Sequence, residues 1–598
     1  MNRAHDPTDT YMLLRAFVDE LSRCGMRAAC TSPGSRCAPL VLSLARDERV
    51  RCFSHVDERC AGFFALGLAK ASGLPVAVAC TSGTAAGELY PAAIEAHEAR
   101  VPLLLLTADR PPELRETGAG QAIDQLKLFG SAAKWFFEVG VERADAAGLR
   151  WMRTLACRAF WTALQGRPGP VHLNFPLREP LVLDEELPGD GSGREAGCPY
   201  VRRAPAAGAS LADAAALGDV LARASRGVVV AGRDERAGPL GAAAVAFADV
   251  AGWPVLADPL SGARRGAAAI AHYDALLRDE AFASAHRPEI VLRVGDLPVS
   301  KPLREWLAGL DGVRQVAIDP DGAWQDPASV LESSLACDAA ETLRELARVR
   351  DEHGQSASPD WLAGWRSADE RAAEAILGVL GEVEISEPGV AAELGVLLPE
   401  EATLFVASSM PVRDIETFWP VREDPPRVLC NRGASGIDGT VSSAFGAAAS
   451  VAGPAVLLIG DVALAHDIGG LLAARRLALK LTIVLVNNDG GGIFDFLAVA
   501  RADMAREREA PGAVSAAGVG EDIYTRHVAT PTGLDFATAA TLYGLEHERV
   551  EDVRALRAAL ERALASERSS MVEVRGDRTS NVELHQRVWR AVARALRS

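Results

Sequence analysis

Long apolar runs and paired cysteines are both missing from this chain of 598 residues. No uninterrupted apolar segment is long enough to cross a bilayer, and the start, MNRAHDPTDTYMLLRAFVDEL, lacks the basic and apolar regions of an export signal. The ten cysteines are scattered singly, with no C-x-x-C pair and no Cys/His cluster at zinc spacing. We therefore expect reduced thiols in a cytoplasmic protein.

Basic charge is also scarce. The chain has 63 Lys and Arg against 80 Asp and Glu, a formal net charge of −17. This balance argues against a nucleic-acid or membrane-surface partner, because both favour a basic face. The motifs G-x-x-x-x-G-K-[ST], G-x-G-x-x-G, G-x-S-x-G and H-E-x-x-H are absent. An anionic ligand would need local arginines and another kind of binding loop.

Short apolar runs alternate with helical patterns along the whole chain. This alternation predicts an α/β fold, with parallel sheets flanked by helices on both faces. Polar stretches at 184–208 and 348–360 separate three such blocks, which predicts domains at 1–185, 205–350 and 360–598. The clearest expected strands are 75–80, 101–109, 169–177, 227–232, 254–258, 289–296, 313–321, 403–408, 455–461, 481–489 and 570–577.

Polar side chains follow two successive apolar runs in the third block. The stretch LLIGDVALAHDIGG, residues 457–470, turns polar at Asp461, and Asn488 lies 27 residues further on, after the next apolar run. One strand-helix-strand unit of about 30 residues brings both to the same sheet edge. Carboxylate, amide and backbone oxygens suit Mg²⁺, and the glycines of NNDGGGIF allow close approach of a diphosphate. The alternative is a helix cap at one position and a turn at the other.

This pair resembles the diphosphate-binding motif of thiamin diphosphate enzymes, in which G-D-x precedes N-N by this interval. Val462 stands where that motif usually has a third glycine. The resemblance implies that Asp461, Asn488 and the carbonyl of Gly490 hold Mg²⁺ or Mn²⁺. It also implies a three-domain thiamin diphosphate-binding fold. The first domain binds the pyrimidine, the second is the middle domain and the third binds the diphosphate.

The same enzymes use a glutamate from the first domain, which hydrogen-bonds the pyrimidine ring and so assists loss of the thiazolium C2 proton. Glu58, in SHVDERCAGFFALGLAKASG (54–73), is the leading candidate. Taken alone, Glu58 in the first turn of a helix would more often be a surface carboxylate that stabilises the helix dipole, and the same holds for the neighbouring Asp57. His55 and His466 are expected to be structural.

Four apolar residues near these motifs have two interpretations. By default they are core residues. The resemblance implies that some of them line the cofactor site. There a bulky apolar side chain would impose the bent conformation of the bound thiamin, and apolar surroundings would favour the neutral form of the intermediate that remains after CO₂ leaves. They are Ile437, Ile493, Phe494 and Leu497.

Six passages, two of which overlap those quoted above, resemble one branch of these enzymes, the 2-succinyl-5-enolpyruvyl-6-hydroxy-3-cyclohexene-1-carboxylate synthases. The resemblance covers nearly the whole chain and is weaker in the middle block, where VGDLPVSKPLREW (294–306) is the main match. The passages are TSPGSRCAPL (31–40), HVDERCAGFFALGLAK (55–70), TADRPPELRETGAGQAIDQLKLFG (107–130), SSMPVRDIE (408–416), NRGASGIDGT (431–440) and NNDGGGIFDFL (487–497).

This branch implies a reaction in menaquinone biosynthesis. 2-Oxoglutarate is decarboxylated on thiamin, and the succinyl carbanion adds to isochorismate in a 1,4-addition. The resemblance also implies a homodimer or a dimer of dimers, because the pyrimidine is held by one subunit and the diphosphate by its partner. The sequence does not indicate the physiological metal, dimer against tetramer, or allosteric control.

The substrates carry carboxylates, which explains arginine-bearing motifs in an acidic chain. The resemblance assigns Ser409 and Arg413 to the succinyl carboxylate. Some relatives have a second basic residue where this chain has Pro302, and what replaces it is open. Taken singly, each arginine could be a solvated surface charge. On the isochorismate side the resemblance places Ser35, Arg36, Arg110 and Lys301, with Gln121 and Arg432 lining the same cavity.

Two other functions stay open at this point. The chain could be another thiamin-dependent 2-oxo acid decarboxylase or an acetolactate-type ligase, although such enzymes need few carboxylate clamps. It could also be a regulatory or scaffold protein that keeps the cofactor fold without turnover. Glu58 together with Asp461 and Asn488 argues against that second alternative.

Overall fold

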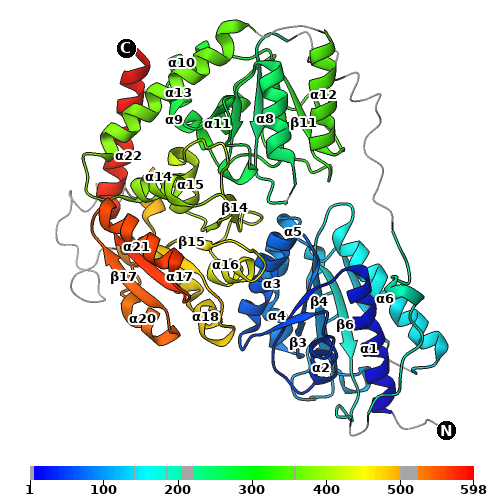
Figure 1. The fold of residues 1–598 in the computed structure, drawn as a ribbon. Helices are drawn as coiled ribbons and strands as arrows, with labels where there is room; N and C mark the ends of the chain where they lie inside the picture. Colours follow the sequence, from blue (N-terminus) through cyan, green and yellow to red (C-terminus); the bar gives the residue numbers. More distant parts are fainter. Residues whose placement is uncertain are drawn as a thin grey trace. The chain divides into compact units, whose positions relative to one another are not determined.

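The structure is a computed structural model that describes residues 6–140, 143–183, 186–203, 217, 221, 224–236, 238–353, 358–498, 500 and 523–597 (Figure 1). The chain divides into two compact units. The first unit comprises 1–206, 431–451 and 467–479, and the second comprises 207–430, 452–466 and 480–598. The described residues contain three six-stranded sheets, all of them parallel, so the predicted α/β class is confirmed.

The first unit is built on one sheet with the strand order β2-β1-β3-β4-β6-β5. Its strands are β1 (Ala28–Thr31), β2 (Arg51–Ser54), β3 (Val76–Cys80), β4 (Leu103–Asp109), β5 (Trp135–Glu138) and β6 (Val171–Pro176). Its helices are α1 (Pro7–Cys24), α2 (Ala38–Ala45), α3 (Glu58–Ser72), α4 (Thr84–Glu88), α5 (Tyr90–Glu98), α6 (Ala146–Leu164), α16 (Thr440–Ala448) and α18 (Leu472–Arg476).

Helices cover both faces of this sheet (Figure 1). Helices α1, α2 and α6 share an apolar core with alternate strand residues such as Ala77 and Ala79. The side chain of Val78, between Ala77 and Ala79, points to the opposite face of the sheet, because successive side chains of a strand point to alternate faces. Helix α3 packs closely against α16, and glycines make this possible. A Cβ at Gly67 would lie 1.8 Å from the carbonyl oxygen of Ser443, so this contact requires glycine.

The second unit contains two sheets. In the first of them the order is β12-β11-β10-β7-β8-β9. Its elements are β7 (Gly227–Ala231), α8 (Leu240–Ala251), β8 (Val255–Ala257), β9 (Ala269–Ile270), α9 (Tyr273–Leu276), α10 (Glu280–Ala285), β10 (Ile290–Val294), α11 (Lys301–Ala308), β11 (Arg314–Ile318), β12 (Ser333–Leu335), α12 (Ala339–His353) and α13 (Pro359–Leu380).

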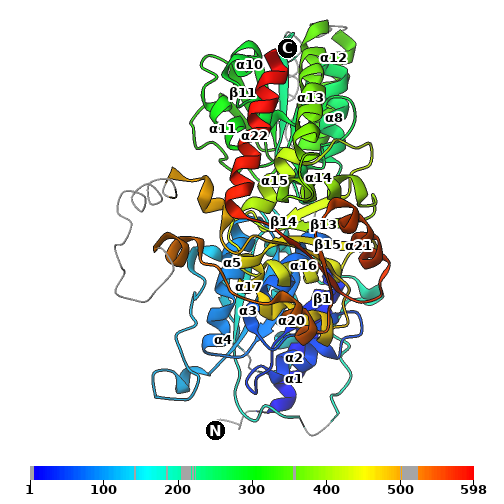
Figure 2. The ribbon, with the colours of Figure 1, turned by 90° about the vertical axis from the view of Figure 1, so that its left-hand side faces the viewer.

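The other sheet of the second unit has the order β14-β13-β15-β16-β18-β17. The long helix α22 (Arg578–Arg597) lies alongside α13, as both views show (Figures 1 and 2). The remaining elements are α14 (Glu387–Leu397), β13 (Thr403–Val406), α15 (Met410–Phe418), β14 (Arg427–Cys430), β15 (Ala455–Gly460), α17 (Asp461–His466), β16 (Thr482–Asn487), α20 (Phe536–Tyr543), β17 (Glu546–Val550), α21 (Val553–Ala565) and β18 (Ser570–Arg575).

The sheet of the first unit and the sheet that holds β13–β18 have the same topology. In each sheet the second strand (β2 or β14) lies on one side of the first strand (β1 or β13). The third strand (β3 or β15) lies on the other side of the first, so the direction of strand addition reverses there. Ligands of open α/β sheets bind beyond the carboxyl ends of the strands, near such a reversal. Two sheet edges are therefore candidates, one at β1 and β3 and the other at β13 and β15.

All eleven expected strand ranges contain strands, because a strand buried in a parallel sheet consists of a short run of apolar residues. The polar stretch 348–360, which was expected to separate two blocks, is helical at both ends, since residues 348–353 continue α12 and α13 already begins at Pro359. Arg348, Asp351 and Glu352 lie on the exposed side of a helix that packs on α8, whereas Arg350 is buried. Residues 354–357 lie outside the described residues.

The other predicted linker, 184–208, is described only at 186–203. Apart from a 3-10 turn at Glu195–Gly197, those residues form no helix or strand. The three domain boundaries stay predictions. All ten cysteines lie in described residues and are free thiols. Among the described helices, none has the length and apolarity needed to cross a membrane.

Candidate functional site

The predicted site residues follow the carboxyl ends of strands. In the first unit, Arg36, Glu58 and Arg110 come after β1, β2 and β4. In the second unit, Ser409, Asp461 and Asn488 come after β13, β15 and β16. Strands β15 and β16 are paired in parallel, with Gly460 opposite Val486, so the 27-residue spacing does place Asp461 and Asn488 on adjacent strands.

Asp461, Asn488 and Gly490 lie together and are buried. The Asp461 Oδ2 atom accepts a hydrogen bond of 2.8 Å from the Gly490 N–H. Gly490 has φ of +137°, and a Cβ there would lie 2.7 Å from the carbonyl oxygen of Ala529, so only glycine fits this turn. Burial raises the pKa of Asp461 to about 6, against the opposing effect of backbone hydrogen bonds from Gly490 and Val462. A cation would offset the cost of the buried charge.

Asn488 supplies the second oxygen. Its Nδ2 donates a hydrogen bond of 2.7 Å to Glu387 Oε1. This bond fixes the amide orientation, and Oδ1 is buried with no hydrogen-bond partner among the described residues. A buried amide oxygen without a partner is costly unless a ligand satisfies it. The donor set of carboxylate, amide and backbone oxygens fits a hard divalent cation such as Mg²⁺.

Glu387 is a residue that the sequence analysis missed. It begins α14, is 6% exposed, and lies 101 residues before the asparagine that it orients. Burial first, and then the nearby Asp414, raise the pKa of Glu387 to about 8. Asp414 Oδ1 lies 3.1 Å from His585 Nε2. Burial alone would lower the pKa of His585, but the hydrogen bond and charge of Asp414 raise it above its usual value. No pattern in the sequence marks Glu387, because only the tertiary contact gives it a role.

Glu58 is the first residue of α3 in the first unit. The neighbouring Asp57 is the N-cap, and its Oδ1 accepts hydrogen bonds from the N–H groups of Arg59 and Cys60 at 2.8 and 3.3 Å. Capping of α3 is therefore carried out by Asp57, which leaves the Glu58 carboxyl available. Burial, followed by the charges of Asp57 and Glu88, raises the pKa of Glu58.

Arg36 and Arg110 lie near each other beyond β1 and β4. The Arg36 guanidinium is buried and donates hydrogen bonds of 2.9 Å to the Leu177 carbonyl and to Glu179 Oε1. Arg110 donates to Ser82 Oγ at 2.5 Å. Burial and the Arg36 charge both lower the pKa of Arg110. Two neighbouring guanidinium groups form a site for a carboxylate.

The loop that carries Arg432 and Ile437 is held by another missed residue, Glu95. The Glu95 carboxylate accepts hydrogen bonds from the N–H groups of Gly433 and Ala434, at 2.8 and 2.7 Å. Glu95 is 3% exposed. Arg432 and Ile437 are half-buried, so the core interpretation of Ile437 holds only in part.

The other predicted substrate residues are more exposed. Ser409 has φ of +75° at the start of α15, and its carbonyl accepts a hydrogen bond of 2.6 Å from exposed Arg413. Lys301 begins α11 with its side chain 84% exposed and 3.4 Å from Glu305. Pro302 is buried in the same helix. Ser35 and Gln121 are also exposed.

Two of the four apolar candidates are not core residues. Phe494 is 37% exposed and Leu497 is 48% exposed, in and just after a 3-10 turn at Gly492–Phe496. Ile493 in the same turn is half-buried. The default core interpretation is wrong for Phe494 and Leu497, because the turn presents these side chains outwards. A role in lining the cofactor site stays a prediction for all four.

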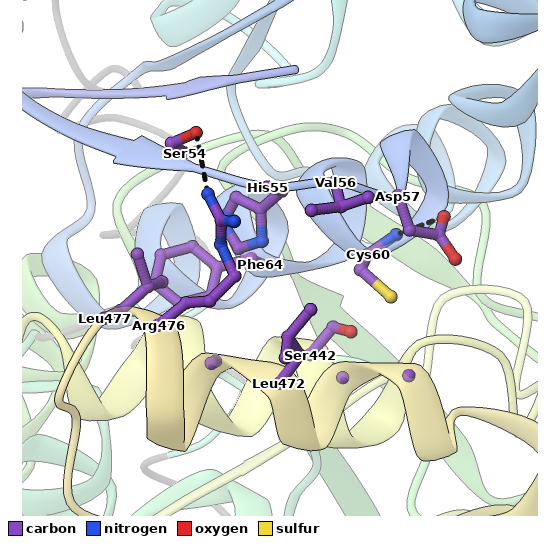
Figure 3. A pocket seen from close by; sticks show the side chains of 13 residues that line it. Ser54, His55, Val56, Asp57, Cys60, Phe64, Ser442, Leu472, Arg476 and Leu477 are labelled. Atoms are coloured by element: carbon purple, nitrogen blue, oxygen red, sulfur yellow. Dashed lines mark hydrogen bonds between the residues drawn. The ribbon is translucent and has the colours of Figure 1, made fainter. Parts of the chain in front are cut away.

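A small pocket lies beside the start of α3, within the first unit (Figure 3). His55, Cys60, Phe64, Ser442 and Arg476 are among its lining residues. His55 packs against the Phe64 ring, and burial followed by the Arg476 charge lowers the pKa of the histidine to about 4. The imidazole is therefore neutral at physiological pH, which fits the expected structural role of His55.

Asp467 near this pocket allows a prediction about stability. Its buried carboxyl accepts hydrogen bonds from the N–H and hydroxyl groups of Ser442 at 2.7 and 3.1 Å. Burial raises its pKa from 3.8 to about 6. Because the folded state prefers the protonated form, this contribution is complete below pH 3.8 and is lost as the pH rises to about 6, a change of about 3 kcal/mol.

We expect Asp467→Asn to remove this dependence, since the amide stays neutral and its oxygen can still accept from Ser442. Melting temperatures of variant and wild type, measured from pH 4 to 7.5, should diverge in favour of the variant as the pH rises. Asp124→Asn is the control, because Asp124 is exposed and belongs to the same unit. Parallel curves for wild type and Asp467→Asn would contradict the prediction.

Comparisons with known proteins agree along nearly the whole chain. Residues 13–128 match the family model of the thiamine pyrophosphate enzyme N-terminal TPP binding domain. Residues 196–406 match the middle domain of thiamine pyrophosphate, and residues 412–574 match the thiamine pyrophosphate enzyme C-terminal TPP binding domain.

Curated proteins named 2-succinyl-5-enolpyruvyl-6-hydroxy-3-cyclohexene-1-carboxylate synthase match at full length. The protein of Geobacillus kaustophilus is 43% identical and that of Chloroflexus aurantiacus 42%, over 97% of this chain and 97% and 96% of theirs. That of Halobacterium salinarum is 40% identical, over 96% of each chain. The chain therefore belongs to the 2-succinyl-5-enolpyruvyl-6-hydroxy-3-cyclohexene-1-carboxylate synthase family of thiamin pyrophosphate enzymes.

Proposed function

We propose that this protein is a thiamin diphosphate-dependent synthase of menaquinone biosynthesis. It decarboxylates 2-oxoglutarate and adds the succinyl carbanion to isochorismate, giving 2-succinyl-5-enolpyruvyl-6-hydroxy-3-cyclohexene-1-carboxylate. The observation that carries the proposal is the buried pair Asp461 and Asn488, with its unsatisfied amide oxygen, in a chain of this family. A scaffold protein without turnover would not need that costly arrangement.

Residues of the first and third predicted domains, taken from two subunits, would hold the cofactor. Asp461, the Oδ1 atom of Asn488 and the carbonyl of Gly490 would hold Mg²⁺ or Mn²⁺, and the metal would hold the diphosphate. When bound, thiamin diphosphate would supply a cationic thiazolium ring that takes up the electron pair left when CO₂ departs. Glu58 would hydrogen-bond the pyrimidine ring, and its raised pKa suits a carboxyl that shares a proton with that ring.

Arginines would bind the substrate carboxylates. Arg413, with Ser409, would pair with the succinyl carboxylate. Arg36 and Arg110 would bind isochorismate, together with Ser35, Gln121, Lys301 and Arg432. Arg36 already has a carboxylate partner in Glu179, whose side chain is 72% exposed. A substrate carboxylate could replace this exposed partner at little cost, because solvated ion pairs contribute little.

The active form would be a homodimer or a dimer of dimers. In this family the first domain of one subunit and the third domain of its partner together make one site, so a two-fold dimer would have two equivalent sites. Sedimentation of the purified enzyme would give its mass. A catalytically active monomer would overturn this part of the proposal. We also infer a cytoplasmic location, in keeping with ten free cysteines.

Mass analysis of the products tests the reaction. The enzyme is incubated with 2-oxoglutarate, isochorismate, thiamin diphosphate and Mg²⁺, and we expect the mass of the succinylated adduct. Reactions without isochorismate or with pyruvate in place of 2-oxoglutarate are the controls. Equal product formation from pyruvate would favour an acetolactate-type ligase. Bound cofactor without any turnover would favour a regulatory protein.

The two substrates should respond to different substitutions. A charge-assisted hydrogen bond contributes roughly 1.5–3 kcal/mol, so Arg413→Ala should raise the apparent KM for 2-oxoglutarate by about 10- to 100-fold. Lys301→Ala and Arg36→Ala should instead raise the KM for isochorismate. Steady-state kinetics with each substrate varied in turn will distinguish them. An effect of Arg413→Ala on isochorismate alone would mean that the assignments are reversed.

A further inference from the structure

Helices α1 and α6 bring together three side chains that no proposed function uses. Glu20 and Cys24 lie one turn apart on α1, and Cys157 lies on α6, which packs against α1 on one face of the first unit's sheet (Figure 1). The ligand atoms of all three lie within 4.8 Å of one another. In the part of the chain that the structure describes, no other group of three His, Cys, Asp or Glu side chains does so.

The separations match those of ligands around one tetrahedral ion. The two sulfur atoms are 3.6 Å apart, and Cys157 Sγ is 3.5 Å from Glu20 Oε1. With Zn–S of about 2.3 Å and Zn–O of about 2.0 Å, tetrahedral angles place ligand atoms about 3.5–3.8 Å apart. A disulfide would need the sulfurs to approach to about 2.05 Å. Van der Waals contact alone allows the same spacing, so the surroundings must decide.

Hydrogen-bond donors surround two of these ligands, Glu20 and Cys157. Arg153 Nη1 donates a hydrogen bond of 2.8 Å to Glu20 Oε2, which leaves Oε1 facing the sulfurs. The Tyr200 N–H also donates to Glu20 Oε1, and the Val201 N–H donates to Cys157 Sγ at 3.3 Å. Hydrogen bonds of this kind orient metal ligands and stabilise a thiolate.

Buried positive charge lies beside the ligands. Two thiolates, one carboxylate and a divalent cation carry a net charge of −1, and Arg153, which is 1% exposed and also pairs with Asp19 and Asp190, offsets part of it. Glu20 is fully buried and Cys157 is 1% exposed, while Cys24 is half-buried. The half-buried side would leave the fourth position to water. Thiolates select zinc over Mg²⁺, which prefers oxygen ligands.

We propose that Glu20, Cys24 and Cys157 form a zinc site with water as the fourth ligand. Binding replaces the two thiol protons, which are released to solvent, and involves no oxidation. The ion would join α1 to α6, and the Tyr200 and Val201 N–H groups hold the segment 190–201 against its ligands. That segment already contacts Arg153 through Asp190 and Ser192, at 2.7 and 2.9 Å. The site does not depend on the proposed reaction.

Cobalt and zinc binding test the proposal on the full-length, reduced enzyme. We expect one Zn²⁺ per chain to remain after dialysis against excess Mg²⁺. Co²⁺ in its place should give a sulfur-to-cobalt charge-transfer band in the near ultraviolet. Cys24→Ser and Cys157→Ser should lose both signals. Cys198→Ser should keep them, because Cys198 lies in the same segment but its sulfur contacts Arg202 instead.

A second measurement keeps the test decisive if a variant fails to fold. In the wild type, Zn²⁺ should protect Cys24 and Cys157 from alkylation, as read by peptide mass, while Cys198 stays reactive. Absence of retained zinc together with unprotected thiols would overturn the proposal. A wild-type peptide pair linked by a disulfide in place of bound metal would overturn it as well.

Discussion

Replacing Glu58 with glutamine is expected to slow exchange of the C2 proton of bound thiamin diphosphate by about 100-fold or more, with the fold intact. Glutamine keeps the shape of the side chain but removes the carboxyl that would share a proton with the pyrimidine ring. Because Asp57 caps α3, the substitution removes no helix cap. The melting temperature of the cofactor-free protein should therefore change little.

The enzyme with bound cofactor is diluted into deuterated buffer, and exchange is quenched at timed intervals. Proton NMR then measures how much of the C2 proton remains. Asp57→Asn is the matched control, since it removes a carboxylate one residue away while an asparagine can still cap the helix. Normal exchange in Glu58→Gln would exclude Glu58 from this role. Equal slowing in both variants would indicate a general effect of charge at the start of α3.

The second large effect is expected for the metal site. Asp461→Ala should weaken binding of thiamin diphosphate by at least about 100-fold, or ~2.7 kcal/mol, because the diphosphate would be held through the cation. The KM values of the substrates should change far less. Calorimetric titration with thiamin diphosphate at limiting Mg²⁺ measures the loss, and excess Mg²⁺ should restore only part of it.

Asp489→Asn provides the control for this experiment. Asp489 is exposed and has φ of +60°, a conformation that asparagine tolerates well, so the turn should survive. Its carboxylate is close to the site but is not part of the proposed ligand set. Wild-type affinity in Asp461→Ala, or an equal loss in Asp489→Asn, would show that the metal ligands are assigned wrongly.

Sequence reasoning found the strands and most of the fold because the signals are local. A buried parallel strand is a short apolar run, and the residue after it lies at the sheet edge where ligands bind. This is why the spacing of Asp461 and Asn488 predicts adjacent strands, which the structure confirms. The end of α12 was missed, because a charged stretch can be the exposed side of a helix as well as a linker.

The supporting residues could not be read in the same way. Glu387 orients Asn488 from 101 residues away, and Glu95 holds the Arg432 loop from 338 residues away. Each is an ordinary glutamate in sequence. Their roles depend on which buried donors the fold places opposite them, and no local pattern contains that information. Exposed Phe494 and Leu497 show the converse, since apolar character alone does not place a side chain in the core.

The sequence by itself determined the α/β class, the family and the local motifs, because periodicity and short motifs depend on neighbours in the chain. Only the tertiary structure decided that Cys24 and Cys157, 133 residues apart and in no recognised spacing, lie 3.6 Å from each other beside a buried carboxylate. Ligand spacing along a chain reveals a metal site only when one short segment supplies the ligands. Where two packed helices supply them, the packing of the helices creates the cluster.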